Sequence, residues 1–488
     1  MTTTLLALFF LFIVLCFFLQ THRKKLATSN NLPPGSFGWP FLGETLEFIR
    51  SQTDGTPERF VRDRVERYGN PLVFKTSLLG HPTAIFSGPE GNKFLFGNEN
   101  KLVAMWLPEA VGRLFGNRCL NTTRGEEAKW LRKTMLPCLG PDALSNRYCI
   151  AMDEVTRLHI QSQWEGRSEV TVFDTVKPYL FELACRLFLN LDDPSRVAEL
   201  GSLFNTFLKG LGSLPIDIPG TQFYRGKRAA IAIKKQLIMI INQRKLTLKQ
   251  ENASSFEDLL SHLLLNSDEN GRFLSEMEIA NNILLLLFAG HDTSAVSITL
   301  LVKCLGEHPD VYKNVLKAIV FIRMSLEQLG ILEGKVPGEV LNWEDIQKMR
   351  YSWNVVCEVL RLNPPVIGSF REALVDFEYA GYTIPKGWKI MWSAPMTQKE
   401  EDNFPNVTKF DPSRFEGTGP TPFTYIPFGG GPRMCLGKEV ARVQILVFLH
   451  NIVTKFKWDL LIPDEKIEYV PLATPVKGLP IRLHPHQV

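Results

Sequence analysis

The chain has 488 residues, of which 45% are hydrophobic and 22% are charged. This balance is typical of a folded protein and excludes a disordered chain. The formal net charge is only +4, so the composition does not favour nucleic acid as a partner. The length allows several ordinary domains or one large domain.

The first residues predict a membrane anchor. Residues 5–19 read LLALFFLFIVLCFFL and contain no charged side chain. This run is slightly shorter than the ~17–25 residues that usually span a bilayer, and a secretory signal peptide is the alternative. However, the start MTTT lacks a basic region, and the basic cluster HRKK follows at residues 22–25. By the positive-inside rule this cluster holds the following chain in the cytosol, so we expect an uncleaved anchor at residues 1–25.

The rest of the chain predicts a mainly α fold with a smaller β portion. Residues 26–45 contain LPPGSFGWPFLGET, whose Pro and Gly residues favour a stiff hinge over a helix. PLVFKTSLL (71–79) and PTAIFSG (82–88) resemble short strands, whereas residues 104–306 show mostly helical periodicity. We therefore expect one large domain over residues 46–488.

Basic residues recur between positions 225 and 249 on an otherwise apolar segment. This pattern predicts an amphipathic helix with a solvated basic face. Contact of that face with anionic lipid headgroups or with an acidic partner is the alternative.

The segment PFGGGPRMCLGKE (427–439) places Cys435 after three consecutive glycines and at the start of a helical pattern. A P-loop is excluded, because Pro432 stands where its first glycine belongs. No nearby base supports a nucleophilic thiol, no C-x-x-C pair exists for a metal ribbon, and cytosolic thiols rarely form disulfides. A thiolate stabilised by a helix start, with glycine backbone close to a flat ligand, suits the axial position of haem. A buried structural cysteine is the alternative.

The residues around Cys435 resemble a known family. FGGGPRMCLG (428–437) fits the F-x-x-G-x-R-x-C-x-G signature of the cytochrome P-450 superfamily, the haem-thiolate monooxygenases. The resemblance implies that Cys435 is the proximal iron ligand of haem b (iron protoporphyrin IX). It also implies that Phe428 packs over the thiolate and that Arg433 pairs with a haem propionate.

Further positions resemble supporting residues of the same family. Arg371 in GSFREAL and Arg132 in EEAKWLRKTML resemble two more propionate-pairing arginines, although an alanine stands four residues before Arg132, where the family often has an aromatic residue. Glu358 and Arg361 form an E-x-x-R pair, for which a surface ion pair is the default interpretation. The family pairs this motif with an arginine of a downstream segment, here Arg414 in FDPSRF, and that triad is structural.

The motif FAGHDTS (288–294) interrupts an apolar helical run. Glycine and a buried carboxylate are locally unfavourable in such a helix, which favours a functional role. The family pattern A/G-G-x-D/E-T matches here, so the resemblance implies an oxygen-binding groove in which Asp292 and Thr293 relay protons to dioxygen. The alternative is that Thr293 bonds back to the carbonyl of Ala289 and only bends the helix.

Longer stretches resemble plant triterpenoid oxidases, the family that includes amyrin and lupeol C-28 oxidases. Among them are PPGSFGWPFLGETLEF, NWEDIQKMRYSWNV and YAGYTIPKGWK. The resemblance implies oxidation of a pentacyclic triterpene, with another terpenoid or a sterol as the alternative. The segments expected to line the substrate pocket are apolar, which suits any lipophile. They contribute Met105, Trp106, Leu107, Ala289, Val366, Ile367, Gly368, Pro475 and Val476.

One stretch departs from the relatives. Residues 318–325, AIVFIRMS, form an apolar insert that either extends a helix or exposes hydrophobic surface and weakens folding or docking. An inactive haem-binding variant is therefore an alternative to the enzyme. Rearrangement of a fatty-acid hydroperoxide is a further alternative, which the intact Asp292–Thr293 pair disfavours.

The resemblance also implies the partners and the location. The chain has no flavin or nicotinamide motif, so electrons come from NADPH through a separate NADPH–cytochrome P-450 reductase. The co-substrates are O2 and a lipophilic small molecule, and nucleic acid is not a partner. We expect a single-pass protein of the endoplasmic reticulum membrane with its catalytic domain on the cytosolic side.

Overall fold

The structure is a computed structural model, and it describes residues 31–250, 258–268, 270–328 and 340–486. The anchor expected at residues 1–25 and the start of the hinge lie outside these residues. Within the described part, one helix is long and apolar enough to cross a membrane, Glu276–Glu307. Its apolar stretch has a mean hydropathy of 1.6 and is 78% buried inside the protein, as is typical of a core helix.

The described residues group into two compact units, and neither is continuous in sequence. The sheet unit consists of the chain up to residue 106 together with Ile367–Val407 and Thr421–Pro432. The helical unit consists of Leu107–Val366, Thr408–Pro420 and the chain from Arg433 onward. The sequence predicts one large domain over residues 46–488, and that single domain stays a prediction.

The sheet unit contains a five-stranded sheet in the order β1-β2-β8-β5-β3. β1 and β2 are the two runs that the sequence predicts as strands, and they form an antiparallel hairpin. Leu79 and Gly80 connect them with φ of 53° and 80°, as tight hairpin turns require. β2 pairs with β8 in parallel, and β8–β5 and β5–β3 are antiparallel. The elements of this unit are α2 (Thr45–Thr53), α3 (Arg59–Arg67), β1 (Val73–Leu78), β2 (His81–Phe86), α4 (Gly88–Gly97), β3 (Val103–Met105), β5 (Gly368–Ala373), β6 (Phe377–Tyr379), β7 (Tyr382–Ile384), β8 (Lys389–Ser393) and α17 (Ala394–Gln398).

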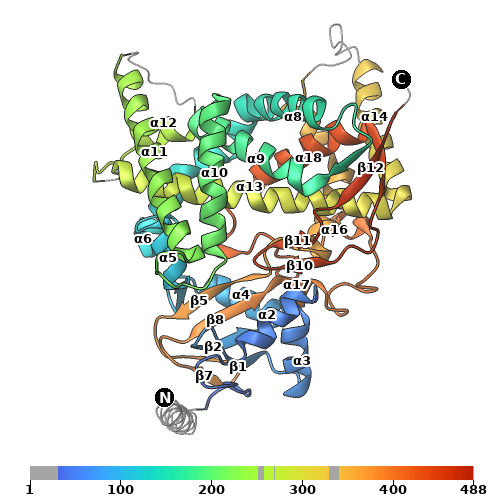
Figure 1. Cartoon of the computed structure of the whole chain (residues 1–488). Helices are drawn as coiled ribbons and strands as arrows, with labels where there is room; N and C mark the ends of the chain where they lie inside the picture. Colours follow the sequence, from blue (N-terminus) through green and yellow to red (C-terminus); the bar gives the residue numbers. More distant parts are fainter. Residues whose placement is uncertain (1–30, 251–257, 269, 329–339, 487–488) are drawn as a thin grey trace, which may run out of the picture. The chain divides into compact units, whose positions relative to one another are not determined.

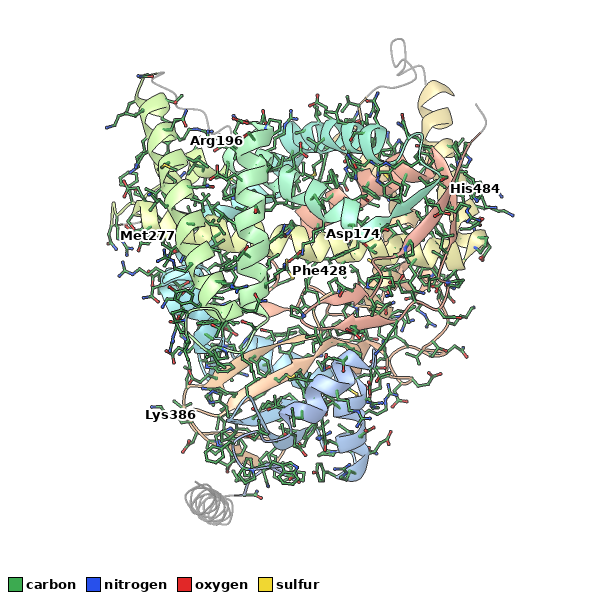
Figure 2. All side chains as sticks on the ribbon, viewed as in Figure 1. Asp174, Arg196, Met277, Lys386, Phe428 and His484 are labelled. Atoms are coloured by element: carbon green, nitrogen blue, oxygen red, sulfur yellow. The ribbon has the colours of Figure 1, made fainter. Side chains whose placement is uncertain are left out.

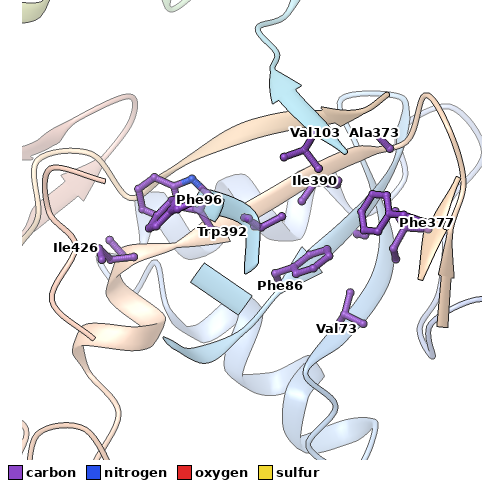
Figure 3. Packing of buried hydrophobic residues seen from close by; sticks show 13 residues of the cluster. Val73, Phe86, Phe96, Val103, Ala373, Phe377, Ile390, Trp392 and Ile426 are labelled. Carbon is purple, nitrogen blue, oxygen red and sulfur yellow. The ribbon is translucent and has the colours of Figure 1, made fainter. Parts of the chain in front are cut away.

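Both faces of this sheet are buried. Alternate residues of a strand point to opposite faces, and the core divides accordingly. Phe86 and Trp392 belong to a cluster that includes Phe96 of α4 (Figure 3), whereas the neighbouring Ile85 belongs to a second cluster that includes residues of α3. In the first cluster, the rings of Phe96 and Trp392 meet edge to face with centroids 5.5 Å apart.

The helical unit holds most of the helices and two small sheets, β4-β12-β9 and β10-β11. The 3-10 turn η3 (Gly431–Arg433) begins in the sheet unit and ends in the helical unit. The other elements of the helical unit are α5 (Glu109–Phe115), α6 (Gly125–Leu139), α7 (Pro141–Ala143), η1 (Leu144–Tyr148), α8 (Cys149–Gln163), β4 (Glu169–Thr171), α9 (Val172–Leu189), α10 (Pro194–Leu211), α11 (Gln222–Gln250), α12 (Leu259–Leu265), α13 (Glu276–Glu307), α14 (Pro309–Gln328), α15 (Trp343–Lys348), α16 (Arg350–Leu362), η2 (Pro412–Phe415), α18 (Lys438–Val453), β9 (Phe456–Leu460), β10 (Ile467–Tyr469), β11 (Ala473–Pro475) and β12 (Pro480–Pro485).

The long helix α13 is the centre of the helical unit. It starts with a capping box, in which the Ser275 hydroxyl accepts from the Glu278 N–H and the Glu278 carboxylate accepts from the Ser275 N–H. Most of its side chains are buried, and α9, α11 and α18 pack against it. The Ser294 hydroxyl donates to Gln444 of α18 at 2.9 Å.

Helices α10 and α11 lie side by side (Figure 1). They approach each other closely at two glycines, where a Cβ on Gly210 would lie 2.6 Å from the Cα of Gly226. α11 covers the basic segment for which the sequence predicts an amphipathic helix, and the structure confirms a helix there.

The apolar insert at residues 318–325 lies within α14, which is one uninterrupted helix. Ile319 is buried, whereas Val320 is 42% exposed. The insert therefore extends a helix and also exposes an apolar side chain, so its effect on folding and docking stays a prediction.

Candidate active site

Cys435 lies just before α18, not at its first residue. The helix begins at Lys438 with Gly437 as its N-cap, so the predicted helix start is three residues too early. The other cysteines of the described residues are all buried, whereas Cys435 is exposed. Exposure sets this thiol apart as the one available to a ligand.

The surroundings of Cys435 influence its pKa in two opposite directions. The thiol is accessible to solvent and also closely surrounded by protein atoms, and the second property decides its pKa. Burial raises the pKa, while the Gly437 N–H and the charges of Arg132 and Lys438 act against this rise without cancelling it. Stabilisation of the thiolate by the helix start and the glycine backbone therefore stays a prediction. Binding of a metal cation deprotonates such a thiol outright.

The glycines before Cys435 are required by their packing in the sheet unit. A Cβ on Gly430 would lie 2.4 Å from the ring of Phe96, and one on Gly431 would lie 2.5 Å from the Phe96 carbonyl oxygen. Gly429 and Gly431 also have φ of 68° and 64°, which other residues rarely adopt. The backbone thus passes directly over Phe96, and this close approach is one that the sequence could not specify.

Two of the predicted propionate-pairing arginines hold the cysteine segment within the helical unit. Arg132 of α6 donates to the carbonyl of Met434 at 2.7 Å. Arg433 donates to the carbonyls of Leu120 at 3.0 Å and Thr123 at 2.6 Å. These bonds tie the segment to α6 and to the turn before it, so both guanidinium groups have a positioning role whatever else they bind.

The third predicted arginine, Arg371, lies on β5 in the sheet unit. It is buried against Glu99, with Nε donating to Oε2 at 2.6 Å. Its Nη1 donates to the Ser369 hydroxyl at 3.0 Å and to the Phe370 carbonyl at 2.9 Å. The pair with Glu99 therefore fixes this guanidinium, and its role toward a propionate stays a prediction. Phe428, labelled in Figure 2, is half-buried in the same unit.

The motif on α13 coincides with a break in the burial of that helix. Ala289 is exposed and Thr293 is partly exposed, although most of α13 is buried. The Thr293 hydroxyl donates to the Ala289 carbonyl at 2.7 Å, the bond that the sequence analysis considers as the alternative to a functional role. The hydroxyl is thus held on the open face of the helix, where it remains within reach of a ligand.

Asp292 forms an ion pair that the sequence does not predict. Its Oδ1 lies 2.7 Å from Nζ of Lys177 on α9, and the carboxylate is only 8% exposed. His291 is also buried, with Nε2 3.2 Å from the same oxygen and Nδ1 2.7 Å from the Leu287 carbonyl. Burial lowers the pKa of His291 despite the nearby carboxylate. A neutral ring that donates from Nδ1 has only a lone pair at Nε2, so Lys177 is the group that balances the Asp292 charge.

Glu358, Arg361 and Arg414 lie together. Arg361 makes two parallel hydrogen bonds of 2.7 Å to the Glu358 carboxylate, and both side chains are fully buried. Nε of Arg414 lies 3.5 Å from Glu358 Oε1, and the Asp411 N–H donates to that oxygen at 3.0 Å. The cluster therefore joins α16 to the segment that contains η2.

Comparison with known proteins decides the family. A family model described as cytochrome P-450 matches residues 33–477. A beta-amyrin 28-monooxygenase from Vitis vinifera is 51% identical, covering 96% of this chain and 95% of the relative. One from Solanum lycopersicum is 50% identical, covering 97% of each. The solved structure of the retinoic-acid-bound cyanobacterial CYP120A1 superposes with a TM-score of 0.83 at 34% identity, covering 94% of this chain and all of that one.

The chain belongs to the cytochrome P-450 family. The protein is thus a haem-thiolate monooxygenase, an enzyme that binds haem b. The predicted family and the mainly α fold with a smaller β portion are confirmed.

The residues of this cytochrome P-450 fit a haem. In the part of the chain that the structure describes, no three His, Cys, Asp or Glu side chains lie close enough together to hold a metal ion. Among the described cysteines only Cys435 is exposed, and a single thiol suits a cofactor that brings four nitrogen ligands of its own. Arg132 and Lys438 place positive charge near that sulfur, which favours its anionic form.

The residues predicted to line the substrate pocket are divided between the two units of the cytochrome P-450. Met105, Trp106, Ile367 and Gly368 belong to the sheet unit, and the others belong to the helical unit. Gly368 has a structural reason to be glycine, because a Cβ there would lie 2.0 Å from the Trp392 carbonyl oxygen. The role of the whole set in binding stays a prediction.

Proposed function

We propose that this cytochrome P-450 oxidises a pentacyclic triterpene of the amyrin or lupeol type at C-28. The observation that carries the proposal is the identity of about 50%, over nearly the whole chain, to relatives named beta-amyrin 28-monooxygenase. The position C-28 is taken from these names. An apolar polycycle agrees with the apolar segments predicted to line the pocket.

Cys435 is the proposed axial ligand of the haem iron. Its exposure among buried cysteines and its place in the signature segment support this role. Arg132, Arg371 and Arg433 are the proposed partners of the haem propionates, with Phe428 beside the thiolate. When bound, haem supplies the redox chemistry that activates O2, and the cysteine thiolate donates electron density to it.

Asp292 and Thr293 are the proposed proton donors of the reaction. Lys177 balances the buried Asp292 carboxylate at 2.7 Å, so this group can exist as an anion inside the protein and exchange a proton. The Thr293 hydroxyl is ordered by the Ala289 carbonyl on the open face of α13. A hydroxyl both accepts and donates, so Thr293 passes on the protons that the reduction of one O2 oxygen to water consumes.

Electrons are proposed to come from NADPH through a separate cytochrome P-450 reductase. The apolar run at residues 5–19 and the basic cluster after it support a single-pass anchor in the endoplasmic reticulum membrane, with the two units on the cytosolic side.

Co-expression in yeast tests the substrate. The full chain is produced with a plant reductase and with either a beta-amyrin synthase or a lupeol synthase, and extracts are analysed by mass spectrometry. The expected product is a triterpene oxidised at C-28, absent with the Cys435→Ala variant. Haem-loaded protein that oxidises neither scaffold would overturn the triterpene proposal, and oxidation at another carbon would overturn the assignment to C-28.

A further inference from the structure

A surface pocket of about 790 Å³ lies in the helical unit, within the size range of small-molecule sites. Its wall combines the turn after α5, the side of α11 and the first turns of α13. None of its lining residues is among those assigned to haem, oxygen or substrate. The pocket is therefore not explained by the proposed function.

Two asparagines of α13 hold one side of this pocket in place, Asn281 in its wall and Asn282 directly after it in sequence. Asn281 donates from Nδ2 to the Asn117 carbonyl at 2.9 Å. Asn282 donates to the Arg118 carbonyl at 3.2 Å and accepts from the Leu120 N–H at 2.9 Å. These bonds hold the turn against the helix, so this wall is formed before any ligand arrives.

The pocket carries more positive than negative charge. Its cationic side chains are Arg118, Lys234, Lys245 and Arg272, and its anionic ones are Glu276 and Glu278. Glu278 accepts from both arginines, at 3.0 and 2.6 Å, and Lys245 pairs with Glu276 at 2.5 Å. Of the four cationic side chains of this pocket, Lys234 alone pairs with neither glutamate.

Lys234 is half-buried on α11, and no hydrogen bond or ion pair joins it to another residue that the structure describes. Burial lowers the pKa of its ammonium group, and the nearby Cys119 opposes this shift without cancelling it. A half-buried ammonium group without such a partner points to an anionic ligand, because buried polar atoms are normally paired.

The same pocket has an apolar rim. Phe273 is 55% exposed and Met277 is 48% exposed, and Met277 lies on the first turn of α13 (Figure 2). Exposed large apolar side chains beside an unpaired cation suit a molecule with an acidic head and an apolar body.

We propose that this pocket binds a lipophilic carboxylate, with its acid group on Lys234 and its apolar body against Phe273 and Met277. Two sources share this chemistry, a fatty acid from the membrane and a triterpenoid acid. The second source rests on the proposed function, whereas the site itself does not.

Photoaffinity labelling tests the site. The haem-loaded full chain in phosphatidylcholine nanodiscs is irradiated with a long-chain carboxylate that carries a diazirine, and labelled peptides are mapped by mass spectrometry. We expect labelling of the segment that contains Phe273 and Met277. The label should fall roughly tenfold in Lys234→Met, because a charge-assisted hydrogen bond is lost, and persist in Lys234→Arg.

Lys235→Met is the matched control, because it removes an exposed charge from the next position on α11 and should leave the label unchanged. Competition by a fatty acid or by a triterpenoid acid identifies the source. Equal labelling in Lys234→Met, or equal labelling by the corresponding uncharged alcohol, would overturn the proposal. A normal haem spectrum shows that each variant is folded.

Discussion

At the scale of single residues, the buried carboxylate of Asp292 is stabilised by an ion pair. A carboxylate that is 8% exposed is costly unless it is paired, and Lys177 provides the pair at 2.7 Å. The neighbouring His291 does not, since its ring is held as a neutral donor to Leu287. The FAGHDTS motif predicts Asp292 from local sequence. Lys177 is not predictable in this way, because it lies on α9 and its partner is set only by the packing of α9 on α13.

The first prediction concerns this pair. In Asp292→Asn, the rate of product formation should fall about 10²-fold, as expected for loss of a proton-transfer group, while the substrate dissociation constant stays the same. Lys177→Met should act in the same direction and change the pH profile of kcat, whereas Lys177→Arg retains the charge and most of the rate. The readouts are kcat, KM and the product formed per NADPH consumed. An unchanged pH profile in Lys177→Met would contradict the role of this lysine.

The second prediction concerns His159 on α8. Its Nε2 accepts from the indole N–H of Trp164 at 3.1 Å, and burial lowers its pKa from 6.5 to about 4. Between these values the unfolded chain binds a proton that the folded chain does not, so stability falls as the pH drops from 6.5 toward 4. The loss approaches about 3 kcal/mol, at about 1.36 kcal/mol per pKa unit.

His159→Gln keeps an acceptor for Trp164 but cannot be protonated. The difference in Tm between pH 7.5 and pH 5, measured by circular dichroism, should therefore be smaller in this variant than in the wild type. The same difference in both proteins would show that His159 does not contribute.

At the scale of elements, α16 and the segment around η2 depend on one buried ion pair. Glu358 and Arg361 are both fully buried, and removing one charge leaves the other unpaired. We predict that Glu358→Gln lowers the free energy of unfolding by about 3–5 kcal/mol.

The matched control is Glu165→Gln, which breaks an exposed pair with Lys455 and should cost no more than about 1 kcal/mol. Thermal unfolding and haem content measure both. A similar, small effect of the two substitutions would contradict the structural role of Glu358.

Helices and strands could be predicted from the sequence where they depend on the pattern of apolar residues within one segment. The strands β1 and β2 and the helices α11 and α13 follow from apolar periodicity, which depends on neighbouring residues. The start of α18 at Lys438 was not predictable, because the segment before it is tied to distant residues, as by the bond from Arg132 to the carbonyl of Met434. Likewise the pairing of β2 with β8 joins residues far apart in the chain, and no local signal specifies it.

At the scale of the whole molecule, the interleaving of the two units was also beyond prediction. The chain enters the sheet unit, leaves it after residue 106 and returns at Ile367. Such a path is decided by contacts between distant segments. The family signature nevertheless predicted the fold class, because ten consecutive residues around Cys435 identify a family whose members share one fold.

The anchor predicts how the full chain behaves in a cell extract. Removing residues 1–25 deletes the apolar run and the basic cluster after it, so the truncated protein should move from the membrane pellet to the supernatant of a high-salt wash, with its haem spectrum unchanged. Recovery of the full-length protein in that supernatant without detergent would contradict the anchor.

The spectrum of the reduced protein with carbon monoxide tests the role of Cys435 most directly. The full-length, haem-loaded chain is compared with Cys435→Ala and with Cys304→Ala, which removes a buried cysteine of α13. We predict a thiolate-type Soret band for the wild type and for Cys304→Ala, and its complete loss in Cys435→Ala. A thiolate-type band that persists in Cys435→Ala would contradict the assignment of this residue as the iron ligand.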